Sequence, residues 1–202
     1  MAALATYKAV LLFGYPGSGK GTQGQVLAGL PNLVHLAMGD IFRALDKQSP
    51  IGQEFLSYSN RGLLVPDELT VRVWDQHVEG QVRAGKYRPD YHILLLDGIP
   101  RTPNQVELLK HLIEVLRVIH LVIPDQEALV ARLKGRAAKA NRPDDADESV
   151  IRKRIAVYEA ETAPVLGALP AGLISNINAD QHPLAVLRDI SAALMPVVPG
   201  NI

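Results

Sequence analysis

Several glycines and one lysine directly behind an apolar run are the residues of this sequence best suited to chemistry. The stretch from residue 10 reads VLLFGYPGSGKGTQ, in which Gly14 and Gly19 bracket four residues and Lys20 follows. Glycine permits left-handed and close-approach backbone conformations, so such a loop turns its N–H groups inward and forms an anion nest at the start of the next helix. Lys20 adds a mobile positive charge for the outer phosphates. The loop therefore predicts a polyphosphate site.

The residue after the lysine departs from the general phosphate-loop pattern. That pattern has Ser or Thr directly after the lysine, whereas this chain has Gly21 there and Thr22 one position later. An ordinary glycine-rich turn is the alternative interpretation. The apolar run before the loop and the helical pattern after it favour the phosphate site.

Length and composition limit the class of protein. The chain has 202 residues, 21 Lys and Arg, 21 Asp and Glu, and no Cys. The length suggests one domain, and the zero net charge argues against a nucleic acid partner, which usually demands a basic excess. The lack of Cys excludes disulfides and thiolate metal sites. No apolar run approaches the about 20 residues that span a bilayer, and the N-terminus lacks a signal-peptide pattern. We expect a cytoplasmic monomer with no membrane partner.

Short apolar runs alternate with helical patterns along the chain. The runs are nearly continuous in Val, Ile and Leu, which is typical of parallel strands covered on both faces. We predict strands at residues 8–13, 34–37, 92–96, 118–123 and 173–177. This alternation predicts βαβ units and a doubly wound α/β sheet.

Local signals mark two of the helices between these strands. Val26, Leu27 and Leu30 recur at helical spacing behind the glycine loop. Asp125 precedes another apolar-periodic stretch, and its side chain is expected to cap that helix.

Five segments, in the expected order, resemble motifs of the adenylate kinase family. GYPGSGKGTQ resembles the family's phosphate loop, where the GKGTQ ending is characteristic. HLAMGDIFR, RGLLVPDEL and LLLDGIPRTPNQ resemble the segments around the bound monophosphate. GRAAKANRPDD, followed by RKR and ETAP, resembles the short form of the lid. The resemblance covers nearly the whole chain.

The resemblance implies both a fold and a reaction. The fold is a three-layer α/β P-loop NTPase domain with a parallel sheet over residues 1–202, a helical NMP-binding insertion at 41–79 and a short lid at 137–149. The reaction is Mg²⁺-dependent transfer of a phosphoryl group from ATP to a nucleoside monophosphate, with AMP favoured. A UMP/CMP-type kinase and a catalytically weak nucleotide-binding homologue are the alternatives.

Phosphoryl transfer needs alignment and charge neutralisation more than covalent help. Arginine suits this task because its planar, permanently charged fork binds phosphate oxygens bidentately. A solvated surface charge is the ordinary alternative for any single arginine. By resemblance, the catalytic residues are Lys20, Arg101, Arg132, Arg136, Arg142 and Arg154. The expected ATP contacts are Gly17, Ser18, Gly19, Lys20, Gly21, Thr22, Arg132 and Arg136. The expected monophosphate contacts are Met38, Arg43, Leu63, Leu64, Val65, Gly98, Ile99, Pro100, Arg101, Gln105, Arg142 and Arg154.

Asp97 ends an apolar run at the carboxyl edge of a predicted central strand, where ligands bind in open parallel sheets. A carboxylate there can hold Mg²⁺ through the water shell of the ion. A turn or capping role before Gly98 is the alternative, and Asp97 alone would favour it. Beside a phosphate loop, the metal role is the better interpretation. A cis peptide bond before Pro100 is expected to aim the arginine that follows.

Two positions bear on the choice of monophosphate. In the usual family segment a Ser-Thr pair precedes Gly-Asp, and the Thr hydroxyl lies near the adenine; here the pair is Ala37 and Met38, and Met38 offers no hydroxyl. Gln105 stands where the resemblance places the side chain that reads the adenine edge, and its amide offers both a donor and an acceptor. RTPNQ resembles the adenine type more closely than the Asn-rich stretch of UMP/CMP-type relatives, so AMP is favoured.

Overall fold

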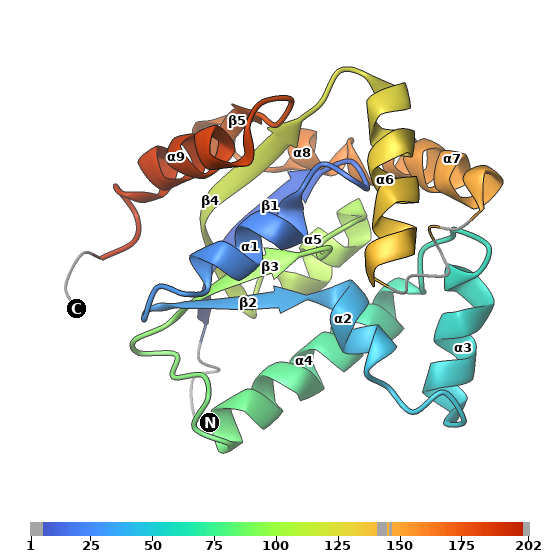
Figure 1. Ribbon diagram of the computed structural model, residues 1–202. Coiled ribbons are helices and arrows are strands. Elements are labelled where there is room, and N and C mark those ends of the chain that lie inside the picture. Colours follow the sequence, from blue (N-terminus) through green and yellow to red (C-terminus); the bar gives the residue numbers. More distant parts are fainter. Residues whose placement is uncertain (1–5, 141–144, 146, 200–202) are drawn as a thin grey trace.

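A five-stranded parallel sheet forms the centre of the computed structural model, which describes residues 6–140, 145 and 147–199 (Figure 1). The strands are β1 (Tyr7–Gly14), β2 (Leu33–Ala37), β3 (Ile93–Asp97), β4 (Ile113–Val122) and β5 (Ile174–Asn178). They lie in the order β2-β3-β1-β4-β5, and every neighbouring pair is parallel. All five predicted strands are confirmed. β4 begins at Ile113, five residues before its predicted start. The sequence pattern missed this part of the strand because Glu114 and Arg117 interrupt the apolar run there.

Helices connect the strands and cover the sheet on both faces (Figure 1). In the described residues the α-helices are α1 (Lys20–Leu27), α2 (Met38–Arg43), α3 (Pro50–Ser59), α4 (Asp67–Arg83), α5 (Pro103–Leu109), α6 (Gln126–Ala140), α7 (Glu148–Val157), α8 (Val165–Ala168) and α9 (Pro183–Leu194). A π-helical turn (Tyr158–Thr162) continues α7, and a 3-10 turn (Ala171–Leu173) precedes β5. None of the helices in the described ranges combines the length and apolar character that crossing a membrane requires.

Side-chain caps explain where several helices begin. Asp125 Oδ1 accepts from the backbone N–H of Glu127, which confirms the predicted cap of α6. Asp147 caps α7 through Ser149 in the same way. The predicted helix behind the loop is present as α1, but it ends at Leu27. Leu30 was predicted to continue the helical pattern, but it lies beyond the helix end and is 49% exposed, because Gly29 and Pro31 interrupt the helix.

Alternate residues of the strands enter two separate hydrophobic cores. On β1, Leu11 and its alternate neighbours pack in one core with side chains of α2, α4, α5 and α8, including Trp74. Val10 and Leu12 pack in the other core with side chains of α1, α6, α7 and α9. A strand presents successive side chains to opposite faces, so a sheet covered on both sides needs strands that are apolar throughout. The nearly continuous apolar runs of the sequence meet this requirement.

Leu95 on β3 tests the contribution of the core to stability. The residue is 0% exposed in the second core, so we expect Leu95→Ala to lower the free energy of unfolding by about 3 kcal/mol through lost burial and a residual cavity. Urea denaturation measures this change. The same substitution at Leu184 on α9, which is 68% exposed, is the control and should stay within about 0.5 kcal/mol. Equal losses in the two variants would contradict this description of the core.

Candidate active site

A cavity of about 1040 Å³ is lined by the loop after β1 and by residues near the ends of β2, β3 and β5. Its size is at the upper end of ordinary small-molecule pockets. Almost every described residue that the sequence predicted for the site lines this one cavity. Ile99 is the exception, because it is 1% exposed and lies in the first hydrophobic core. Arg142 lies outside the described residues.

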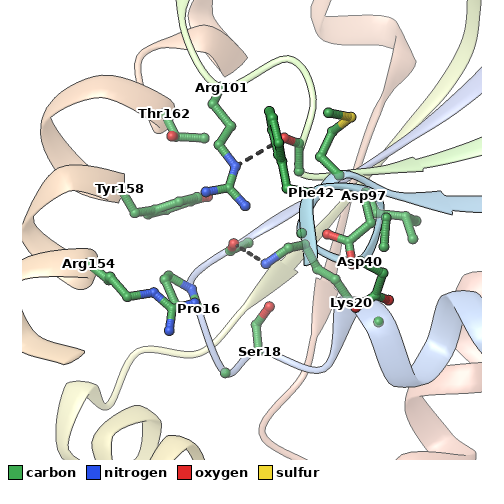
Figure 2. Close-up of a pocket in the computed structure, with 18 of the residues that line it drawn as sticks. Pro16, Ser18, Lys20, Asp40, Phe42, Asp97, Arg101, Arg154, Tyr158 and Thr162 are labelled. Carbon is green, nitrogen blue, oxygen red and sulfur yellow. Dashed lines mark hydrogen bonds between the residues drawn. The ribbon is translucent and has the colours of Figure 1, made fainter. Parts of the chain in front are cut away.

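The glycine loop has the backbone of an anion nest. Gly14, Gly17 and Gly19 have φ values of 141°, 85° and 100°, in the range that side chains disfavour, and α1 begins directly afterwards at Lys20. Ser18 is 3% exposed, and its hydroxyl has no hydrogen-bond partner among the described residues. Figure 2 shows this side chain beside the loop. A buried hydroxyl without a partner at the start of a helix suits a phosphate oxygen.

Lys20 forms hydrogen bonds with the backbone of the glycine loop. Its ammonium group donates to the carbonyl oxygens of Gly14 (2.7 Å) and Tyr15 (3.0 Å), and Figure 2 shows one of these bonds. Burial lowers the pKa of Lys20 to about 8, and nearby arginines act in the same direction while Asp97 opposes them. A bound phosphate group would raise the pKa of Lys20 again, because an anion favours the charged ammonium.

Arg101 follows β3 and is aimed by the glycine before it. Its Nε donates to the carbonyl oxygen of Gly98 (3.1 Å), and the Ile99–Pro100 peptide bond is cis, as expected. Gly98 has φ 83°, a conformation that residues with a side chain rarely adopt, and a Cβ there would lie 2.8 Å from an Nη atom of Arg101, so the guanidinium would have to shift. Burial lowers the pKa of Arg101, Arg154 adds to the effect, and Asp97 opposes it.

Two further arginines share one buried carboxylate. Asp145 is 0% exposed, and it accepts from Arg136 Nε at 2.6 Å and from Arg154 Nη1 at 2.5 Å. Burial by itself raises the pKa of Asp145, but the two guanidinium groups together outweigh it and hold the pKa below its ordinary value. Asp145 therefore binds α6 to α7 and holds both cations at the cavity.

The other two arginines at the cavity are bound to exposed carboxylates. Arg132 donates to the carbonyl oxygen of Ala179 (3.1 Å) and to Asp180 (3.0 Å) behind β5. Arg43 donates to Asp40 at 2.6 Å on the surface of α2. Exposed ion pairs are worth little, so these arginines can exchange their partners for phosphate or base at small cost.

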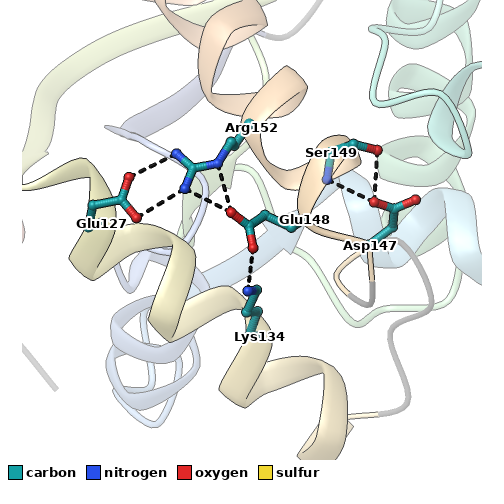
Figure 3. A network of polar contacts seen from close by, with 6 residues as sticks. All are labelled: Glu127, Lys134, Asp147, Glu148, Ser149 and Arg152. Carbon is teal, nitrogen blue, oxygen red and sulfur yellow. Dashed lines mark hydrogen bonds and ion pairs between the residues drawn. The ribbon is translucent and has the colours of Figure 1, made fainter.

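A second, exposed set of charges joins α6 to α7 on either side of the predicted lid (Figure 3). Arg152 binds both oxygens of Glu127, at 2.8 and 3.0 Å, and also Glu148, at 2.9 Å. Lys134 donates to the other oxygen of Glu148. Lys134 on α6 precedes the segment at 137–149 and Glu148, the first residue of α7, lies near its end, so this network links the two helices that flank the segment.

Asp97 has the surroundings of a metal-binding carboxylate. It ends β3 and lines the cavity, and Lys20 and His35 lie close to it. His35 Nε2 is 3.9 Å from Asp97 Oδ2, an electrostatic contact rather than a hydrogen bond. Burial raises the pKa of Asp97, but His35 and Lys20 together outweigh it and keep the pKa below its ordinary value.

A single carboxylate such as Asp97 is enough to bind Mg²⁺. No group of three or more potential ligands (His, Cys, Asp or Glu) is arranged to hold a metal in the described ranges. Mg²⁺ keeps most of its waters and binds through one or two carboxylates and the phosphates of its substrate, so a single ionised carboxylate beside a phosphate loop fits this ion.

The cavity also contains residues to which no sequence motif assigns a functional role. Tyr158 lines it, and its ring packs against Tyr15 of the loop with centroids 4.4 Å apart. Ala179 and Gln181, directly after β5, line it as well. The rule that ligands bind at the carboxyl ends of parallel strands would have pointed to the residues after β5. Nothing in the sequence separates Tyr158 from an ordinary core aromatic.

A phosphate loop between β1 and α1, with a lysine and several arginines around one cavity, defines a P-loop nucleotide-binding protein equipped for phosphoryl transfer. A family model described as adenylate kinase matches residues 12–170. An adenylate kinase from a Cyanothece species is 42% identical over 164 residues, covering 78% of this chain and 79% of the relative.

Two longer matches give the same result. An adenylate kinase from a Synechococcus species is 37% identical over 192 residues (92% of this chain, 95% of the relative). Another, from Renibacterium salmoninarum, is 35% identical over 198 residues (95% and 96%). The chain therefore belongs to the adenylate kinase family and is a phosphotransferase of the nucleoside monophosphate kinase class.

The pKa of Lys20 predicts how activity depends on pH. Because this pKa is about 8, the ammonium is charged below pH 8 and becomes neutral above it. We expect kcat/KM for ATP, which reports the free enzyme, to fall by up to about tenfold per pH unit above pH 8. Steady-state kinetics from pH 7 to 9.5 measure this fall.

Lys20→Arg is the matched control, since a guanidinium stays charged throughout this range. Its activity should be lower but flat with pH. A flat profile for the unmodified chain would show that Lys20 does not titrate near 8.

Proposed function

We propose that this protein transfers the terminal phosphoryl group of Mg·ATP to AMP, forming two molecules of ADP. The observation that carries this proposal is the convergence of Lys20, Arg101, Arg136 and Arg154 on one cavity beside the phosphate loop. Such a cluster of cations neutralises the oxygens of the phosphoryl group during transfer and aligns the two nucleotides.

The residues divide between two nucleotides. The loop nest, Lys20 and Arg132 bind the ATP side, where Arg132 lies next to the residues after β5. Arg43 and Arg101 bind the phosphate of the acceptor. We assign to Arg136 and Arg154, both of which pair with Asp145, the role of stabilising the moving group.

Asp97 would hold Mg²⁺ through water, and the ion would supply positive charge at the phosphate oxygens. The protein's own contribution is to keep the Asp97 carboxyl ionised and next to Lys20. Asp40, which lines the same cavity, is paired with Arg43 and is therefore a weaker candidate for the metal's water shell.

The choice of AMP rests on Gln105 and on the apolar walls near it. Gln105 lines the cavity, as do Leu63, Leu64 and Val65, and an amide beside apolar walls suits a base that needs one donor and one acceptor. Met38 lines the same region and is 2% exposed. It packs against the base without contributing a hydrogen bond.

We further propose that residues 41–79 bind the monophosphate, that residues 137–149 act as a short lid, and that the enzyme is a cytoplasmic monomer. Closure over both nucleotides would exclude water, which otherwise competes for the phosphoryl group.

A coupled assay for ADP formation with AMP, UMP or CMP as acceptor tests the proposed function. With saturating Mg·ATP we expect AMP to give the highest kcat/KM. Lys20→Ala, prepared identically, is the control for contaminating kinases and should lose at least about a hundredfold in turnover. A preference for UMP or CMP would overturn the choice of acceptor. No transfer to any of the three would overturn the proposed reaction.

Hydrogen exchange tests closure of the two segments. A bisubstrate analogue that joins two adenosines through a polyphosphate should slow exchange in residues 41–79 and 137–149, because closure protects backbone amides that open locally in the free protein. The strands, including β1 and β3, should change little, which provides an internal control. Unchanged exchange in both segments at saturating analogue would contradict the moving lid.

A further inference from the structure

The amide of Gln105 is held in one orientation by two groups of fixed polarity. Its oxygen accepts from the backbone N–H of Arg101 at 2.7 Å, and its nitrogen donates to Asp67 Oδ1 at 2.8 Å. Turning the amide over would set donor against donor at Arg101 and acceptor against acceptor at Asp67. Gln105 is only 1% exposed, so bulk water cannot compensate for either mismatch.

Asp67 is itself fixed at the start of α4. Its Oδ2 accepts from Thr102 Oγ1 at 2.9 Å and from Asn104 Nδ2 at 3.0 Å. Thr102 also caps α5 by accepting from the backbone N–H of Gln105. Both carboxylate oxygens are thus engaged, and Asp67 connects α4 to the start of α5. Gln105 lines the cavity whereas Asp67 does not, so Asp67 acts through Gln105.

The fixed amide leaves one donor and one acceptor for a ligand. A glutamine amide has two N–H hydrogens and two oxygen lone pairs, of which Asp67 and Arg101 each use one. The remaining N–H and lone pair complement the N1 acceptor and the 6-amino donor of adenine. A 6-oxopurine presents N1–H and O6, the reverse polarity, and would need the amide turned over.

We propose that Asp67 is a positioning residue that makes the acceptor site select 6-aminopurine over 6-oxopurine mononucleotides, by fixing the orientation of the Gln105 amide. This inference rests on the proposed function, in which Gln105 lies beside the acceptor base. A site built to hydrogen-bond a base rejects the analogue of opposite polarity because buried polar groups are then left unpaired.

The test compares AMP with inosine monophosphate (IMP), which differs from AMP only in the polarity of this edge. We expect the unmodified enzyme to favour AMP by about a hundredfold or more in kcat/KM. Asp67→Asn is nearly isosteric, and its amide can present either a donor or an acceptor to Gln105. In Asp67→Ala, water can occupy the space of the lost side chain and can also present either a donor or an acceptor to Gln105. In both variants the AMP-to-IMP ratio should fall by about tenfold, while the KM for ATP stays unchanged.

Asn104→Ala is the matched control, because it removes one partner of Asp67 Oδ2 and leaves the bond from Asp67 Oδ1 to Gln105. The AMP-to-IMP ratio of kcat/KM in this variant should stay within about twofold of the ratio in the unmodified enzyme. General loosening of the fold would lower activity with both nucleotides alike and would not move the ratio.

The outcomes separate this inference from the function on which it rests. If the unmodified enzyme uses AMP but both Asp67 variants keep its AMP-to-IMP ratio, the inference is wrong and the proposed function stands. If the unmodified enzyme does not phosphorylate AMP, both are overturned. A lower ratio in Asn104→Ala equal to that in the Asp67 variants would assign the effect to the α4–α5 contact rather than to Gln105.

Discussion

Repulsion between like charges at the carboxyl edge of the sheet is the constraint on which the rest of the structure depends. One cavity is lined by Lys20, Arg101, Arg136 and Arg154. Only rigid supports keep such a cluster together, and the two carboxylates Asp97 and Asp145 supply part of the compensation. The rest must come from a ligand with several negative charges. In the proposed function, the polyphosphate of ATP supplies this charge.

The two-sided core provides the rigidity that this cluster needs. Because each strand is buried on both faces, Asp97 and the glycine loop are attached to the least mobile part of the molecule. Arg43 and Arg154 lie on helices, α2 and α7, whose apolar side chains pack in the two cores. In the proposed function, the groups that bind the two nucleotides are therefore carried both by the sheet and by the helices that cover it.

In the proposed function, recognition of the base and binding of the phosphate both depend on residues at the start of α5. The backbone N–H of Arg101 donates to Gln105, and the guanidinium of the same arginine lines the cavity. Gly98 gives that guanidinium its space, and Thr102 begins the helix that carries Gln105. Under that proposal, one short segment after β3 positions both the acceptor base and its phosphate.

The sequence by itself determined the sheet, the phosphate loop and most of the residues around the cavity. These features depend on local signals: apolar runs, glycines at fixed spacing, and arginines within recognisable motifs. The start of β4 was missed because charged residues interrupt its apolar pattern. Only the tertiary structure decided which carboxylate pairs with which arginine, that Ile99 lies in the core, and that Asp67 contacts Gln105 across 38 positions. Such contacts join different elements, and no local pattern encodes them, because they depend on how α4, α5, α6 and α7 pack on the sheet.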